Sequence, residues 1–274
     1  MNFQKFSYSY KKHGLIGFAN TLFSKIGLKY RFNLPINKLI LFLNNEVEKK
    51  SKNKILSGNY KNLYLEINKN WSKLDIASKY LGFYEQEVQN EIINNKKINK
   101  SKKKYFINLG AGDGYHSLGL LKKNLFNKSI LYEMNKDGRN LIFKNAKKNK
   151  LSKKIIIKDK AEINFLDGLI HNKFNMKDCF FLFDIEGDEF KILNDQNIRK
   201  LKKSTLLIEI HHFYQNPNKL IKKLKVFFKL KFITTESRNL SKIKFLDKFH
   251  DIEKWLLVNE GRPSKMQWIL CDPK

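Results

Sequence analysis

From Tyr105 to the C-terminus, short apolar runs alternate with longer polar stretches that have helical spacing. Continuous apolar runs of this length are typical of strands that are buried on both faces, as in a parallel sheet. Strands that alternate with helices in this way build βαβ units. The sequence therefore predicts an α/β, Rossmann-like fold with a seven-stranded, mostly parallel sheet, helices on both faces and a basic helical N-terminal extension.

The expected elements follow directly from this alternation. Five parallel strands are expected at residues 105–109, 129–132, 154–157, 179–183 and 205–210, and a closing hairpin at 232–235 and 267–271. Crossover helices are expected at 118–123, 138–147 and 190–201, and a further helical stretch at 61–100 that includes 80–93. The Lys/Asn-rich stretch 94–104 has charge and no periodicity, which favours a linker. We therefore divide the chain into an extension, 1–100, and a sheet domain, 101–274.

The net charge of +29 raises nucleic acid as a partner. However, 50 of the 55 basic residues are lysine and 5 are arginine. Phosphate-binding sites usually include arginine, because its guanidinium group pairs with phosphate bidentately. We therefore interpret the basic runs 96–104 and 144–154 as solvated surface and do not expect a nucleic-acid partner. Weak attraction to an anionic membrane still follows from the charge.

The two cysteines, Cys179 and Cys271, make neither a disulfide framework nor a zinc motif, which favours a reducing, cytoplasmic location. The N-terminus has no clean apolar run followed by a cleavage site, so no signal peptide is expected. Residues 15–28 are apolar but too short to span a bilayer. We expect them to form a helix packed on the main domain. Peripheral attachment to a membrane surface is the alternative.

A glycine-rich turn, which runs from Asn108 through Gly110, Gly112 and Gly114, follows the first expected strand. Glycine permits positive φ and lets the backbone approach a ligand closely. The second expected strand ends at Glu133, nineteen residues beyond Gly114, where a carboxylate can accept hydrogen bonds from ribose hydroxyls. The spacing GxGxG is neither the dinucleotide fingerprint GxGxxG nor a P-loop, which argues against both of those nucleotide-binding classes. A methyl donor that carries adenosine fits better.

Four acids, Asp184, Glu186, Asp188 and Glu189, follow the fourth expected strand. Open α/β sheets bind ligands in the crevice at the carboxyl ends of their strands, so we expect Asp184 and Glu186 to face that crevice. Asp188 is interpreted as solvated. Glu189 has either a functional role or the role of matching the charge of the next helix's first turn.

The fifth expected strand carries Glu209 and ends in His211 and His212. A histidine in this place can exchange protons near neutral pH. Glu209 is a mid-strand carboxylate and needs a partner or a place in the site, because an unpaired buried charge is costly.

Four ordered segments, 108–117, 132–135, 184–189 and 208–211, resemble the motifs of FkbM-type methyltransferases, with Asp184-Ile-Glu-Gly-Asp-Glu189 the most specific of them. The resemblance covers about residues 80–235, and Tyr84-Glu85 is similar to an upstream helix motif. It implies a class I methyltransferase fold for 101–274, S-adenosylmethionine as cofactor, and O-methylation of sugars or other hydroxyl groups on polysaccharides, glycolipids and related metabolites. Asn108 stands where the family usually has an acid.

The turn and the resemblance together define the expected site. The cofactor is expected to contact Asn108, Gly110, Ala111, Gly112, Asp113, Gly114, Glu133, Met134 and Asp184. His211 is the expected base for the acceptor hydroxyl, with Asp184 as second choice, while Glu186 orients the acceptor or holds His211. No metal is expected, although these three groups are also able to coordinate a divalent cation.

The segment 236–265 interrupts the closing hairpin and is expected to form much of the acceptor pocket. Substrate binding is assigned to Glu209, His212, Arg262 and Trp268, with Trp255 as a further stacking candidate. Packing of the tryptophans in the core, and a plain Arg262–Glu260 salt bridge, are the structural alternatives.

Other functions remain open at this point. An RNA or protein methyltransferase would use the basic surface, but Asp184-Ile-Glu-Gly187 stands where amine methyltransferases usually carry an Asn-Pro-Pro-Tyr-type motif. A non-catalytic relative would keep the fold without binding the donor. We expect a small-molecule or glycan acceptor, and the sequence leaves its identity and the oligomeric state open.

Overall fold

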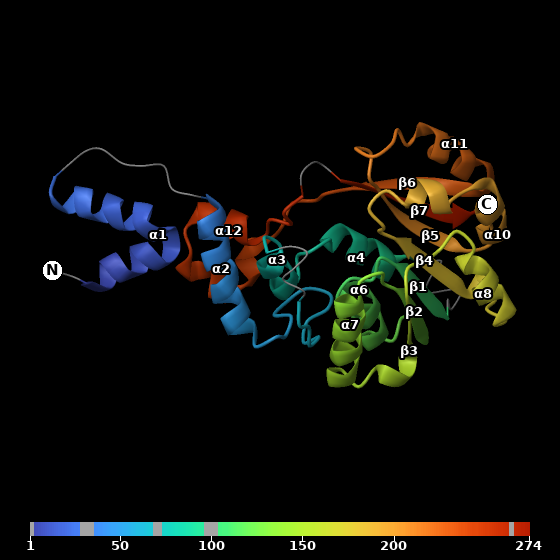
Figure 1. The fold of residues 1–274 in the computed structure, drawn as a ribbon, viewed down its shortest axis with the longest axis horizontal. Coiled ribbons are helices and arrows are strands. Elements are labelled where there is room, and N and C mark those ends of the chain that lie inside the picture. The colour runs from blue at the N-terminus through green and yellow to red at the C-terminus, as the bar shows by residue number, and fades with distance from the viewer. Residues whose placement is uncertain (1–2, 28–35, 68–72, 96–103, 263–265) are drawn as a thin grey trace.

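The structure is a computed structural model that describes residues 3–27, 36–67, 73–95, 104–262 and 266–274. Its centre is a seven-stranded sheet with the strand order β3-β2-β1-β4-β5-β7-β6 (Figure 1). The strands are β1 (Tyr105–Leu109), β2 (Lys128–Tyr132), β3 (Ile155–Lys158), β4 (Cys179–Phe183), β5 (Thr205–Ile210), β6 (Phe228–Thr234) and β7 (Gln267–Pro273). Only β7 runs antiparallel to its neighbours, β5 and β6. The expected Rossmann-like, mostly parallel sheet is confirmed.

The strand order reverses between β1 and β4, which pair in parallel so that Leu109 lies opposite Phe183. The loops that leave these two strands therefore emerge side by side. The backbone N–H of Asp184 donates to the carbonyl of Leu109 at 3.0 Å. A reversal of this kind opens a crevice at the carboxyl ends of the strands, and this is where open α/β sheets bind ligands.

Alternate residues of the central strands enter different hydrophobic clusters on the two faces of the sheet. In β1, Phe106 joins one cluster and Ile107 the other, and in β4 Leu182 and Phe181 divide in the same way. The face of Phe106 is covered by α6 (Tyr115–Lys122) and by N-terminal residues. The opposite face is covered by α8 (Phe165–His171), α10 (Asp195–Leu201) and α11 (Asn218–Phe227). Every residue of β4 and β5 is buried, as expected for continuous apolar runs.

Two of the expected helices differ in the structure. The stretch 190–201 divides into α9 (Glu189–Ile192) and α10, because the side chain of Asn194 caps α10 by accepting from the N–H of Asn197 at 2.9 Å. The stretch 80–93 divides into α3 (Ile76–Leu81) and α4 (Gln86–Asn94), because Gly82 takes a left-handed conformation that ends α3. The helix α7 (Lys136–Lys148) lies close to its expected place, whereas α8 and α11 were not expected.

The N-terminal part begins with α1 (Phe3–Lys25), which is kinked at Gly14 (φ 66°, ψ −152°). The two halves fold back on each other, with the rings of Phe6 and Phe18 5.2 Å apart. The expected helix at 15–28 forms the second half, although Leu28 lies outside the described residues. Helix α1 as a whole packs on α2 (Ile36–Ser51) and lies at the end of the molecule far from the sheet (Figure 1).

The segment between β6 and β7 leaves the sheet and returns to it. Its helix α12 (Asp251–Leu257) packs against α2, so this segment lies beside the N-terminal helices, whereas β7 after it returns to the sheet (Figure 1). One hydrophobic cluster runs from Leu43 of α2 to Leu257 of α12 and Phe106 of β1. The predicted boundary near residue 100 falls within 96–103, outside the described residues, and stays a prediction. Within the described part of the chain, no helix combines the length and apolar character needed to cross a bilayer.

Candidate active site

A cavity of about 680 Å³ opens at the carboxyl ends of β1, β2, β4 and β5. Twelve of the residues assigned to the site from the sequence line it: Asn108, Gly110, Ala111, Gly112, Asp113, Glu133, Met134, Asp184, Glu186, Glu209, His211 and Arg262. The residues chosen from the sequence therefore lie together around one cavity. The two ends of this cavity differ in chemistry.

The glycine turn, residues 110–114, fixes the first end. Gly110 has φ 81°, and a Cβ added there would lie 1.7 Å from the carbonyl oxygen of Asp184, so this position admits no side chain. The N–H of Gly112 donates to Oε2 of Glu133 at 2.9 Å, and the N–H of Asn135 donates to Oε1 at 2.7 Å. Burial raises the pKa of Glu133. Each of its oxygens keeps a second lone pair, so the side chain can also accept hydrogen bonds from a diol.

Asn108 has an unsatisfied acceptor at the cavity. Its Nδ2 donates to Oγ of Ser117 at 3.1 Å, whereas its Oδ1 is buried without a hydrogen-bond partner. Buried polar atoms normally have partners, so an orphan acceptor in a cavity wall indicates a ligand that carries N–H groups. The ammonium group of an amino acid has this chemistry.

His211 stands at the second end, where Glu189 holds its ring. Oε1 of Glu189 lies 3.0 Å from Nδ1 of His211 and also accepts the backbone N–H of His211 at 3.1 Å. Glu189 is fully buried. Because a carboxylate accepts the proton of Nδ1, the lone pair of the neutral ring lies on Nε2. Glu189 is also the acid in the first turn of α9, so it makes this orienting contact from the position that the charge-matching alternative expected.

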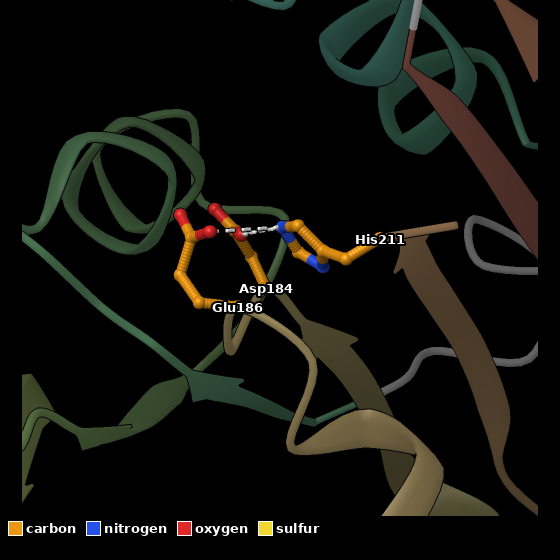
Figure 2. A group of neighbouring side chains, drawn as sticks. All are labelled: Asp184, Glu186 and His211. Carbon is orange, nitrogen blue, oxygen red and sulfur yellow. Dashed lines mark ion pairs between the residues drawn. The ribbon is translucent and has the colours of Figure 1, made fainter. Parts of the chain in front are cut away.

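The free ring nitrogen of His211 points toward two carboxylates, as Figure 2 shows. Nε2 lies 3.7 Å from Oδ1 of Asp184 and 3.5 Å from Oε2 of Glu186. Burial lowers the pKa of His211, but the carboxylates of Glu189, Asp184 and Glu186 outweigh it, and the pKa is raised above the ordinary histidine value. His211 is therefore a proton acceptor with neighbours that stabilise its charged form.

Asp184 and Glu209 form a coupled acid pair. Burial raises the pKa of Asp184 and raises that of Glu209 well above its usual range, and carboxylate oxygens of the two residues lie within 4.8 Å of each other. A shared proton explains how two acids coexist here, because two like charges in contact cannot both ionise. Glu209 thus has the partner that a mid-strand carboxylate needs.

Six side chains are joined by salt bridges into a set that we call the ion-pair chain: Arg238, Arg262, Glu85, Glu87, Glu209 and Glu260. Four of them, Arg262, Glu85, Glu209 and Glu260, line the cavity. Arg262 contacts three of these carboxylates, and its Nε lies 2.9 Å from Oε2 of Glu260. Arg238 joins Glu260 at 2.7 Å and Glu87 at 2.6 Å. The Arg262–Glu260 salt bridge considered from the sequence therefore exists, but as one link of a larger buried set.

Several cavity residues were missed, and they lie in the N-terminal part and on α6. Lys79 lies 3.1 Å from Asp113 and 3.4 Å from Asp75, and its Nζ lies 4.8 Å from the centre of the Tyr84 ring. His116 on α6 lies 2.6 Å from Glu85. Nothing local distinguishes Lys79 from the other lysines in the sequence, so only the fold reveals its position.

Four expected residues lie outside the cavity lining. Gly114 shapes the turn with φ 86°. His212 is exposed beside β5, and Trp268 is buried in the hydrophobic cluster on β7. Trp255 is 59% exposed on α12. Of the segment 236–265, the described residues 260–262 contribute to the cavity wall.

The strand order, the glycine turn after β1 and the acid after β2 define a Rossmann-like methyltransferase fold. Among solved structures, the METTL16 methyltransferase domain is similar to 98% of this chain over 91% of its own length, with 16% identity and a TM-score of 0.54. This likeness establishes the fold.

Two further methyltransferases share shorter regions with the chain. A precorrin-6y C5,15-methyltransferase from Geobacter metallireducens covers 69% of this chain and 89% of its own, at 15% identity and a TM-score of 0.44. TrmK of M. capricolum, solved with S-adenosyl-homocysteine, covers 66% and 69%, at 14% identity and a TM-score of 0.38. No family model and no curated protein matches the sequence.

Proposed function

We propose that this chain is an S-adenosylmethionine-dependent methyltransferase that acts on a hydroxyl group, in a sugar of a polysaccharide, a glycolipid or a related metabolite. One observation carries the proposal: the lone pair of His211, directed by Glu189, faces the same cavity as the glycine turn and Glu133. A proton acceptor beside a nucleoside-binding turn is what methyl transfer to a hydroxyl requires. The motif resemblance to FkbM-type enzymes supports the same assignment.

The residues at the first end fit the cofactor. Glu133 would accept the ribose hydroxyls, and the orphan Oδ1 of Asn108 would accept the ammonium group of the methionine part. Gly110 and Gly112 let the backbone approach the ligand closely. When bound, S-adenosylmethionine supplies a methyl group on a positively charged sulfur.

Replacing Glu133 by alanine is expected to weaken the binding of S-adenosylmethionine about 10- to 100-fold, because hydrogen bonds to a charged group contribute about 1.5–3 kcal/mol. Titration calorimetry measures the change. Glu162→Ala, at an exposed acid, is the matched control and should leave the affinity unchanged. An unaltered affinity in Glu133→Ala would contradict the ribose assignment.

At the second end, the acceptor hydroxyl would give its proton to Nε2 of His211 as the methyl group arrives in line. Alignment of the two reactants contributes up to about 7–11 kcal/mol in well-oriented systems. Asp184 is the second candidate for the base. Glu186, whose side chain is 74% exposed, stands at the mouth of the cluster and would orient the acceptor.

The rate of methyl transfer should rise with pH as His211 loses its proton, with a midpoint above the ordinary histidine value of about 6.5. The carboxylates of Glu189, Asp184 and Glu186 raise the pKa of His211. Glu189→Gln keeps a hydrogen-bond acceptor for Nδ1 but removes the charge, so its profile should shift toward lower pH. A pH profile of the single-turnover rate tests this, and an unshifted midpoint in Glu189→Gln would sink the orienting role.

The charge of the cavity favours a neutral acceptor over RNA. Nine carboxyl groups but only three lysine or arginine side chains stand among the described residues that line it. Phosphates close to this wall would be repelled, whereas sugar hydroxyls can bond to it. Incubation with labelled donor and a panel of glycans, lipids and RNA tests which class of acceptor is methylated.

Failure to bind S-adenosylmethionine at all would favour a non-catalytic relative.

A further inference from the structure

The kinked helix α1 and the two residues after it, which we call the N-terminal hairpin (residues 3–27), expose an apolar surface. Phe6 is the only large apolar side chain of residues 6–27 that is buried. Six others are exposed, several of them by more than half: Tyr8, Tyr10, Leu15, Ile16, Phe18 and Ile26. Contiguous exposed apolar side chains in a folded protein commonly mark an interaction site. The hairpin therefore presents several large apolar side chains to the solvent.

The charged residues in this part of the sequence have one sign. The first 45 residues contain seven basic residues and no acid: Lys5, Lys11, Lys12, Lys25, Lys29, Arg31 and Lys38. Lys12 forms a salt bridge with Glu253 of α12. Lys11 and Lys25 are exposed on the hairpin, and Nζ of Lys25 lies 4.9 Å from the centre of the Phe6 ring. Aromatic, aliphatic and basic side chains are thus exposed together.

We propose that the N-terminal hairpin docks on the surface of an anionic lipid bilayer. Leu15, Ile16 and Phe18 would enter the boundary between headgroups and acyl chains, while the lysines remain at the headgroups. A second copy of the chain fits less well, because two such surfaces would bring like charges together. RNA fits less well too, because it offers nothing to cover the aliphatic side chains.

The position of the hairpin agrees with this role. It lies at the end of the molecule opposite the sheet (Figure 1), and none of its residues lines the cavity. Docking therefore leaves the proposed active site unobstructed. Each half of the kinked helix is too short to cross a bilayer, so the contact is with the surface. The proposal depends on no step of methyl transfer.

Co-sedimentation of the full chain with vesicles tests the proposal. Vesicles of phosphatidylcholine with phosphatidylglycerol should sediment the protein, and pure phosphatidylcholine vesicles should bind it far less. Leu15→Asn with Phe18→Asn should lower the partition constant at least about tenfold, since each exposed side chain contributes apolar area to the contact. Lys11→Gln with Lys25→Gln should lower it by about tenfold as well.

Matched controls separate the hairpin from the overall charge. Ile163→Asn with Val226→Asn alters exposed apolar residues of the sheet domain, and Lys153→Gln with Lys203→Gln alters exposed lysines there. Both should bind vesicles like the unaltered chain. Equal losses in the hairpin and control variants would overturn the proposal, as would the absence of vesicle binding. A dimer that the Leu15/Phe18 variant abolishes would also overturn it, in favour of a second copy.

Discussion

Replacing His211 by alanine is expected to slow methyl transfer by about 10²–10⁴-fold, the usual contribution of a positioned general base. The binding of S-adenosylmethionine should persist, because the glycine turn and Glu133 lie at the other end of the cavity. Single-turnover transfer of a labelled methyl group measures the rate, and calorimetry measures the binding. A loss of less than about tenfold with binding intact would remove the assignment of His211 as the base.

Two controls make this result specific. His171→Ala, at an exposed histidine of α8, should leave the rate unchanged. A chelator should also leave the rate of the unaltered chain unchanged. Asp184, Glu186 and His211 place their ligand atoms within 4.8 Å of one another and are thus able to hold a cation. Loss of activity on chelation, restored by a divalent metal, would show that His211 is a ligand instead of the base.

Replacing Arg262 by methionine is expected to lower the free energy of unfolding by about 3–5 kcal/mol, because removing one member of a buried ion pair leaves the other uncompensated. Glu85 and Glu209, which Arg262 contacts, have side chains only 1% and 3% exposed. Urea denaturation measures the change. Arg199→Met, at an exposed arginine of α10, should stay within about 0.5 kcal/mol of the unaltered chain.

The loss of unfolding free energy in Arg262→Met should depend on pH. The pKa of Glu85 is lowered in the folded chain because Arg262 and His116 outweigh the effect of burial. This group therefore contributes stability above its unfolded pKa and loses it as the pH falls. The difference in the free energy of unfolding between Arg262→Met and the unaltered chain should be largest near neutral pH. It should shrink as the pH falls below ~4.3, the unfolded pKa of glutamate, toward the folded pKa of about 2. A difference in unfolding free energy that grows on acidification would contradict this role of Glu85.

Much of the sheet was predictable because its strands are short, continuous and buried on both faces. The expected and observed bounds agree fully for β1, β4 and β5, the strands at the centre. The peripheral elements agree less well, since β6 begins at Phe228 and not at 232. Its burial alternates irregularly, with Lys229 and Lys231 pointing outward, so apolar content alone does not mark its start.

The cavity was predictable where its residues follow strands directly, as Asp184 and His211 do. What the sequence could not indicate was the contact between remote segments. Arg262 and Glu85 are separated by 177 residues, and neither forms part of a local pattern that predicts the other. Trp268 shows the opposite error. The sequence suggested that it binds the substrate, but its side chain is packed in the hydrophobic core beside the sheet.

The ion-pair chain also sets an order of events during synthesis. Glu87 and Glu85 leave the ribosome 151 and 177 residues before the arginines that neutralise them. At roughly 5–20 residues per second, that interval lasts on the order of ten to thirty seconds. Throughout it the nascent N-terminal part carries acids that cannot be buried together with their cations. The wall of the cavity can therefore close only when nearly the whole polypeptide has been made.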